Sequence, residues 1–180
     1  MNTTIPTAGK IAAGLALAAG AVAATFLTTT AHAEVNVAAL ATASCDAPGL
    51  DDGRSCAGAL EWAQNHITSS NAGYYNQCDH VMGLAYGWEH SGSETAMVHW
   101  RQIPGQYKHA GDDQPPAGAL VFFSTSKPAG HVAMSTGGDG VISTDIGGRG
   151  SLTRSTIGQI TGKWNAHYLG WANPWFKANH

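Results

Sequence analysis

The sequence has few charged residues. Of its 180 residues, 9 are Lys or Arg and 12 are Asp or Glu. These charges form no basic stripe and do not alternate with aromatic side chains, as they would on a nucleic-acid-binding surface. We therefore expect no nucleic-acid partner. The many Gly, Trp and Tyr residues favour a loop-rich α+β or β domain over a helical bundle.

Metal-ligand motifs are also missing from the sequence. The chain has nine His and three Cys, but it contains no His-Glu-x-x-His and no Cys-x-x-Cys motif. Zinc sites in proteins usually show such paired spacings. We therefore expect no metal and no cofactor, and we interpret His80, two residues from Cys78, as a structural histidine.

The first 33 residues have the pattern of a secretory signal peptide. Lys10 supplies the positive charge, Ile11 to Leu27 form an apolar run rich in Ala and Gly, and Ala31-His32-Ala33 is a small-x-small cleavage site. A single-pass anchor is the alternative, although the run is slightly shorter than the roughly 20 residues of a spanning helix. We expect export, to the medium or the cell wall, and no stable membrane span in the mature chain.

The remaining chain has the length of one domain with its own core. Without Lys10, 8 Lys and Arg remain against 12 Asp and Glu, a net charge of −4. We assign residues 34–44, rich in Ala, Thr and Val, to a leader. Residues 45–180 are assigned to a single domain, which we expect to be monomeric.

The spacing of apolar residues changes along this domain. Helical spacing comes first, in residues 57–67, 78–88 and 96–100, with Ser93 as a possible N-cap of the third helix. Residues 103–118 read as a loop. A period of two follows and predicts strands at 119–124, 130–136, 140–145 and about 164–172. Helices followed by an antiparallel sheet indicate an α+β fold.

The three cysteines predict one disulfide and one free thiol. Export permits disulfides, and Cys45 and Cys56 flank a stretch rich in Pro, Gly and Asp that is typical of a tight loop. Pairing them leaves Cys78 free, whereas the alternative is that Cys78 pairs with one of the other two. We favour the first pairing because Asn76 is a plausible N-cap that places Cys78 in a first helical turn. The helix dipole and unpaired N–H groups there favour thiolate.

His131 is the histidine that best suits this thiol. It opens a predicted strand, and a cysteine at a helix start can meet a strand histidine once the chain folds, forming a nucleophile pair. The alternatives are an inert buried thiol and a structural histidine.

A base histidine usually needs a third polar group to fix its tautomer. Asp145 is the first candidate because a carboxylate also stabilises imidazolium; Ser143 is the second, and Asn165 and Asp139 are further alternatives. Beside the Cys78 backbone N–H, Tyr75 or Gln77 could supply an oxyanion donor.

These residues resemble the NlpC-type and CHAP-type cell-wall peptidases and amidases. The resemblance covers roughly residues 55–176 and is carried by Cys78 at a helix start, by the strand Pro116 to Phe123 and by Gly130-His131-Val132-Ala133. It implies that Cys78 is the nucleophile and His131 the base, with Ser143 or Asp145 in the third position. The family pattern has Asp before and Ser-Gly after its cysteine. Here Gln77 precedes and Asp79-His80 follow, which favours the CHAP-like side.

The resemblance also implies a papain-like fold, with helices packed on a small antiparallel sheet, and hydrolysis of amide bonds in bacterial peptidoglycan. The bond would lie in a stem peptide, a cross-bridge or a muramoyl-alanine linkage. Two alternative functions belong to other classes of protein. One is a transpeptidase or transamidase that uses the same residues with an amine acceptor. The other is a secreted wall-binding or toxin-like module without chemistry.

Overall fold

The computed structural model describes residues 53–180. The predicted signal peptide (1–33), the leader (34–44) and Cys45 lie outside the described residues, so those assignments stay predictions. In the described part of the chain, no helix is long and apolar enough to cross a membrane.

The described residues form an α+β fold, as predicted, but the order differs from the prediction because the helix at 157–164 comes between the last two strands. Its sheet has six strands in the order β1-β6-β2-β3-β4-β5, and every pair of neighbours is antiparallel. The strands are β1 (Lys108–Ala110), β2 (Leu120–Ser124), β3 (His131–Gly137), β4 (Gly140–Thr144), β5 (Leu152–Thr156) and β6 (His167–Ala172). The α-helices are α2 (Cys56–Asn65), α3 (Cys78–Ala85), α4 (Ala96–Gln102) and α5 (Ile157–Trp164). Short 3₁₀ turns are η1 (Ala72–Tyr74), η2 (Gly105–Tyr107) and η3 (Lys177–Asn179).

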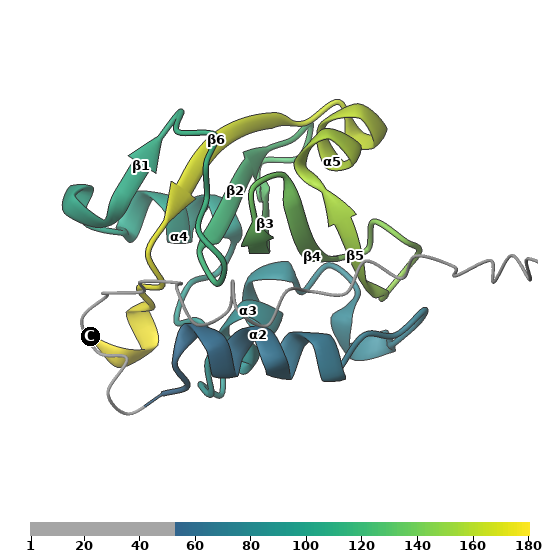
Figure 1. The fold of residues 1–180 in the computed structure, drawn as a ribbon, viewed down its shortest axis with the longest axis horizontal. Helices are drawn as coiled ribbons and strands as arrows, with labels where there is room; N and C mark the ends of the chain where they lie inside the picture. The colour runs from purple at the N-terminus through teal and green to yellow at the C-terminus, as the bar shows by residue number, and fades with distance from the viewer. Residues whose placement is uncertain (1–52) are drawn as a thin grey trace, which may run out of the picture. The chain divides into compact units, whose positions relative to one another are not determined.

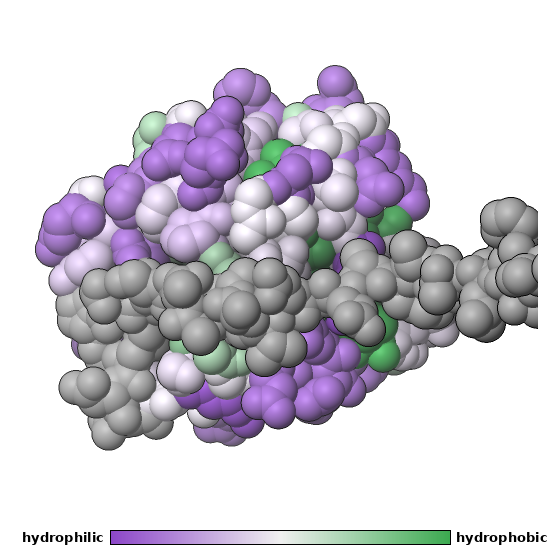
Figure 2. Space-filling view, viewed as in Figure 1, coloured by the Kyte–Doolittle hydropathy of each residue, from purple (hydrophilic) through white to green (hydrophobic). Residues whose placement is uncertain are grey.

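Helices cover both faces of the sheet. Helices α2 and α3 lie below it in Figure 1, and α5 lies near β5 at the upper right. Leu120 and Phe122 of β2 belong to the core on the side of α2 and α3, whereas Val121 and Phe123 belong to a second core beside Ile160 of α5. Because β2 is buried on both faces, it reads as a continuous apolar run. The face of the molecule shown in Figure 2 is mostly hydrophilic, with small scattered hydrophobic spots.

Local capping explains where the helices begin. Ser55 accepts a hydrogen bond from the Gly58 N–H at the start of α2, and Thr95 accepts one from the Val98 N–H at the start of α4. The N-cap of α4 is therefore Thr95 and not Ser93 as predicted, because the Ser93 hydroxyl donates instead to the Gln102 side chain. The predicted strand at 164–172 is shorter than expected, since α5 ends at Trp164 and β6 begins at His167.

Candidate active site

A pocket of about 670 Å³ lies where several loops meet the start of α3. Its lining includes residues 75–77 and, from the β4–β5 loop, Asp145 and Arg149. It also includes residues 93–96, at the start of α4, and residues 125–127, 129 and 130 in the β2–β3 loop. Cys78 and His131 both line this pocket. The structure thus brings together two residues that are 53 positions apart in the sequence.

Cys78 is the first residue of α3, as predicted, and it is a free thiol. The N-cap, however, is Gln77 and not Asn76, which adopts the left-handed region at φ +57°. Gln77 makes no capping hydrogen bond with its side chain. The Gln77 side chain therefore leaves the N–H groups at the start of α3 uncapped. The Cys78 N–H among them can donate to a bound oxyanion.

The surroundings of the thiol favour its protonated form. Burial raises the pKa of Cys78 to about 12, and any negative charge on Asp79 or Asp145 acts in the same direction. Backbone hydrogen bonds from Val132 and Asp79 lower the pKa but do not outweigh burial. Burial therefore opposes the thiolate that the helix start alone favours. Because Val132 follows His131 directly, its hydrogen bond also places the sulfur against the start of β3.

His131 is buried, and burial lowers its pKa to about 3. Its Nε2 lies 2.7 Å from the Ser143 hydroxyl, which in turn donates to the Thr144 carbonyl at 3.2 Å. Since the Ser143 hydroxyl donates its only proton to the Thr144 carbonyl, its oxygen accepts the hydrogen bond from the Nε2–H of the imidazole. This assigns the neutral tautomer in which Nδ1 carries the lone pair. The Trp164 ring packs edge-on against the imidazole, with ring centres 4.8 Å apart.

Asp145 does not make the hydrogen bond that the sequence predicts for it. Its carboxylate accepts hydrogen bonds from the backbone N–H groups of Asn76 (2.9 Å) and Gly150 (2.7 Å). The prediction assumed that strand alternation continued to residue 145. Strand β4 ends at Thr144, and Asp145 has φ +62°, which turns its side chain out of the alternating pattern. Ser143, the second candidate, takes the place beside His131. Of the further alternatives, Asn165 caps α5 in the left-handed region and Asp139 accepts a hydrogen bond from the Gly158 N–H.

Tyr75 and Gln77, the two candidate oxyanion donors, also line the pocket. Gln77 and Tyr75 are both exposed, so their side chains are accessible to a ligand. The guanidinium of Arg149 lies over the Tyr75 ring, 4.1 Å from its centre. Arg149 and Lys127 bring two cations to the pocket lining, and Glu94 brings an anion. In residues 53–180, neither cationic side chain forms an ion pair with protein.

The sequence analysis did not identify His99. It is fully buried and pairs with Asp79, the residue after Cys78, with 2.6 Å between Nδ1 and Oδ1. The two residues are 20 positions apart, and no short motif links them. An acidic residue in the first turn of a helix is common because it complements the dipole, so Asp79 gave no separate signal.

Cys56 is disulfide-bonded, so it has no free thiol. Its predicted partner, Cys45, lies outside the described residues. Within residues 53–180, no group of three or more His, Cys, Asp or Glu side chains could hold a metal ion. Comparisons of the chain with protein-family models, curated proteins and solved structures found no match.

Proposed function

We propose that this protein is a cysteine hydrolase that cleaves amide bonds, with Cys78 as the nucleophile, His131 as the base and Ser143 as the residue that orients His131. One observation carries the proposal. Cys78 and His131 line the same pocket, and the hydrogen bond from His131 to Ser143 leaves Nδ1 as an unprotonated acceptor. A nucleophile, a base and an orienting group are the minimum set for acyl transfer.

The reaction starts from a thiol and a neutral imidazole, because burial raises the pKa of Cys78 and lowers that of His131. Nδ1 of His131 takes the thiol proton as the sulfur attacks the amide carbonyl. The tetrahedral oxyanion accepts hydrogen bonds from the Cys78 N–H, at the start of α3, and from Gln77. The imidazolium then gives its proton to the leaving amine, and an acyl-enzyme remains. Water, activated by His131, releases the acid and restores the thiol.

The proposed substrate is bacterial peptidoglycan, and the proposed setting is the cell wall or medium after export. The signal-peptide pattern of residues 1–33 supports export, and the Gly-His-Val-Ala block supports a papain-like wall hydrolase. The pocket adds a chemical argument. Its walls carry Arg149 and Lys127 as well as Glu94, and stem peptides present both carboxylates and amines. Complementary charges of this kind fix the orientation of a ligand.

A transpeptidase with the same residues is the second candidate, since an amine and water can both accept the acyl group. The observation that favours it is Glu94, an anion in the pocket wall that could hold an ammonium group. The non-catalytic module has less support, because the site retains a nucleophile, a base and an orienting group.

Incubation of the purified protein with peptidoglycan, followed by mass spectrometry of the fragments, tests the proposal. Hydrolysis adds one water across the cleaved bond, whereas transfer to added glycinamide adds the mass of that amine less the leaving group. Cys78→Ala is the matched control, and its fragments should equal those of untreated wall. Absence of any new fragment with the unmodified protein, under conditions where its thiol is reduced, would contradict the function.

A further inference from the structure

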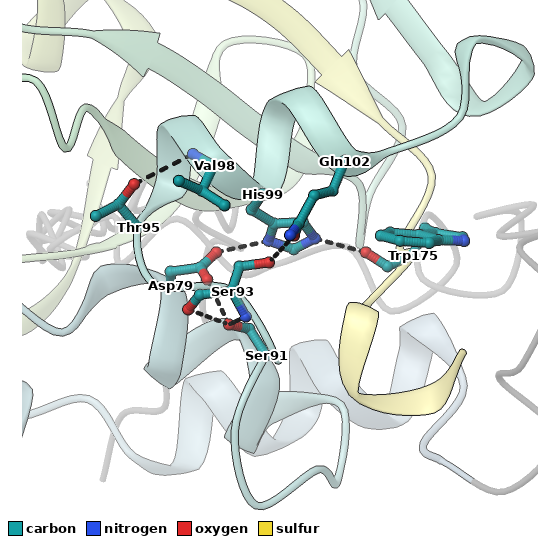
Figure 3. A network of polar contacts seen from close by, with 8 residues as sticks. All are labelled: Asp79, Ser91, Ser93, Thr95, Val98, His99, Gln102 and Trp175. Atoms are coloured by element: carbon teal, nitrogen blue, oxygen red, sulfur yellow. Dashed lines mark hydrogen bonds and ion pairs between the residues drawn. The ribbon is translucent and has the colours of Figure 1, made fainter.

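A buried polar network centred on Asp79, the residue after Cys78, links α3 to α4 (Figure 3). The imidazole of His99 is held between the Asp79 carboxylate and the Trp175 backbone carbonyl, 2.6 Å from the former and 2.5 Å from the latter. The second carboxylate oxygen of Asp79 accepts a hydrogen bond from the Ser91 hydroxyl. Two further segments, the loop at Ser91 and the segment after β6, thus meet the pair that α3 and α4 form.

The geometry fixes the number of protons in this pair. A backbone carbonyl only accepts hydrogen bonds, so Nε2 of His99 must carry a proton. The contact between Nδ1 and Asp79 then needs a second proton, either on Nδ1 or on the carboxyl group. In both cases the pair has one proton more than a carboxylate beside a neutral imidazole. The Asp79–His99 pair is therefore net neutral.

The surroundings of His99 are apolar, so water does not solvate the Asp79–His99 pair. The Phe122 and Phe176 rings pack against the imidazole, with ring centres 5.4 and 5.3 Å away. His99 is fully buried and Asp79 is 5% exposed. Without His99, a carboxylate held only by the Ser91 hydroxyl would keep its charge uncompensated, and that charge would act over a long range because the local dielectric is low.

The nearest group that such a charge would affect is the Cys78 thiol, one residue away. A negative charge on Asp79 raises the pKa of Cys78. The other ionisable groups that face the thiol in the pocket are Asp145 and His131, and His80, Glu94, Lys127 and Arg149 lie along its walls. None of these is hydrogen-bonded to Asp79 within the described residues.

We propose that His99 is a positioning residue that keeps Asp79 in a net neutral pair and so limits the cost of ionising the neighbouring Cys78 thiol. This inference rests on the proposed function only in taking Cys78 as the nucleophile. Its second role is mechanical, since His99 joins the first turn of α3 to α4 and to the segment after β6. The charge role can be separated from the mechanical role because it predicts a change in thiol chemistry with a definite sign.

The test measures the rate at which iodoacetamide alkylates Cys78 between pH 7 and 10, in the full chain with its disulfide intact. This rate follows the thiolate fraction and needs no substrate. His99→Gln keeps a hydrogen-bond donor but removes the positive partner, so Asp79 is left charged. We expect the rate at each pH to fall about 10- to 100-fold, the order expected for one uncompensated charge a residue away.

The second arm uses a rescue variant. Asp79→Asn can donate to Nδ1 and accept from Ser91, so its pair with His99 is again neutral, and its alkylation rate should be at least that of the unmodified protein. The double variant Asp79→Asn/His99→Gln carries no charge and should regain the rate of Asp79→Asn. A purely mechanical role predicts the opposite, because two disruptions would then be at least as harmful as one.

His66→Gln is the matched control. The His66 ring contacts the carbonyl and the ring of Trp62 on α2, and that helix does not line the pocket.

Two results would overturn the proposal. One is a folded His99→Gln protein that is alkylated as fast as the unmodified chain, and the other is a double variant as slow as His99→Gln. Where His99→Gln does not fold, nitrogen-15 and carbon-13 spectra of the unmodified protein at pH 7 decide the matter. We expect a proton on Nε2 and one further proton shared by Nδ1 and Asp79. A bare Nδ1 beside an ionised Asp79 would contradict the neutral pair. Hydrolysis is not measured in either arm, so failure of the proposed function would not be confused with failure of this inference.

Discussion

The carboxylate of Asp145 accepts a hydrogen bond from the backbone N–H of Asn76, two residues before Cys78. The same carboxylate accepts a second bond from the Gly150 N–H across the β4–β5 loop. Both Asn76 and Asp145 have positive φ, so two strained positions meet at one contact. This contact joins the segment that presents Cys78 to the loop that carries Arg149.

Asp145→Asn should weaken this contact without removing the base. An amide has one oxygen, so one of the two backbone N–H groups loses its acceptor. We expect the free energy of unfolding to fall by about 1–3 kcal/mol, the usual cost of leaving such a group unpaired. Urea unfolding measures this change, and Asp113→Asn, at an exposed site, is the control. Equal unfolding midpoints for the two variants would show that the contact adds no stability.

Ser143→Ala should reduce catalysis more than stability. His131 would lose the acceptor that fixes its tautomer, and the imidazolium formed in the reaction would lose a hydrogen bond worth about 1.5–3 kcal/mol. That energy corresponds to a fall in kcat of about 10- to 100-fold. Rates of Ser143→Ala and Asp145→Asn on purified peptidoglycan should be compared side by side. A near-normal Ser143→Ala with a crippled Asp145→Asn would return the orienting role to Asp145.

Cys78→Ala should abolish hydrolysis and leave the fold intact. The side chain is small and only half-buried, and no disulfide depends on it. Fragment release from peptidoglycan and a thermal melt measure the two properties on the same sample. Persistent hydrolysis by a correctly folded Cys78→Ala protein would eliminate the mechanism.

The pH dependence should distinguish a thiol that His131 deprotonates during attack from a preformed thiolate–imidazolium pair. The pKa of His131 is lowered to about 3, so the base stays unprotonated above that pH, and the pKa of Cys78 is raised to about 12, so the thiol stays protonated below that pH. We therefore expect kcat/KM to be nearly level between roughly pH 5 and 10, since base and thiol keep the required forms. Alkylation of Cys78, which needs free thiolate, should instead rise about tenfold for each pH unit. A bell-shaped kcat/KM with limbs near neutrality would indicate a preformed thiolate–imidazolium pair.

Gly130→Ala should disturb the base directly. Gly130 precedes His131 with φ +64°, and an added Cβ would lie 2.5 Å from Met97 Cγ and 2.8 Å from the Phe123 carbonyl oxygen. Crowding of this kind costs about 1–3 kcal/mol of stability, and the displaced imidazole should also lower kcat. Gly137→Ala is the control because its φ is +102° but no atom lies within 4 Å of the new Cβ. We expect it to lose some stability through backbone strain while keeping the rate. Equal rates for the two variants would argue against tight positioning of His131 by Gly130.

Much of this fold follows from apolar spacing. The sequence predicts α2, α3 and strands β2 to β4 within a few residues, because each buries a regular set of side chains. Strand β5 was missed, since only Leu152 is buried in Leu152–Thr156 and its other residues are polar. The pairing of β5 with β4 holds it in the sheet. Helix α5 was missed because Gly158 and Gly162 lower its helical propensity, and a capping box formed by Thr156 and Gln159 offsets this.

The site was predictable only where chemistry and local structure coincide. Cys78 stands at a helix start and His131 at a strand start, so both could be chosen from their neighbours. The choice between Ser143 and Asp145 depended on where β4 ends, and a positive φ at Asp145 is not visible in the alternation of side chains. The Asp79–His99 pair could not be found because it depends on how α3 and α4 pack together.

The position of β6 within the sheet has a consequence for biogenesis. Although β6 is the last strand in sequence, it lies between β1 and β2 and pairs with both. The residues just after it supply Trp175 and Phe176 to the same core as α2 and α3. A ribosome-bound chain that ends before residue 167 would have neither the completed sheet nor the carbonyl that holds His99. The surroundings of the Cys78 thiol are therefore completed only late in synthesis, after most of residues 53–180 have emerged.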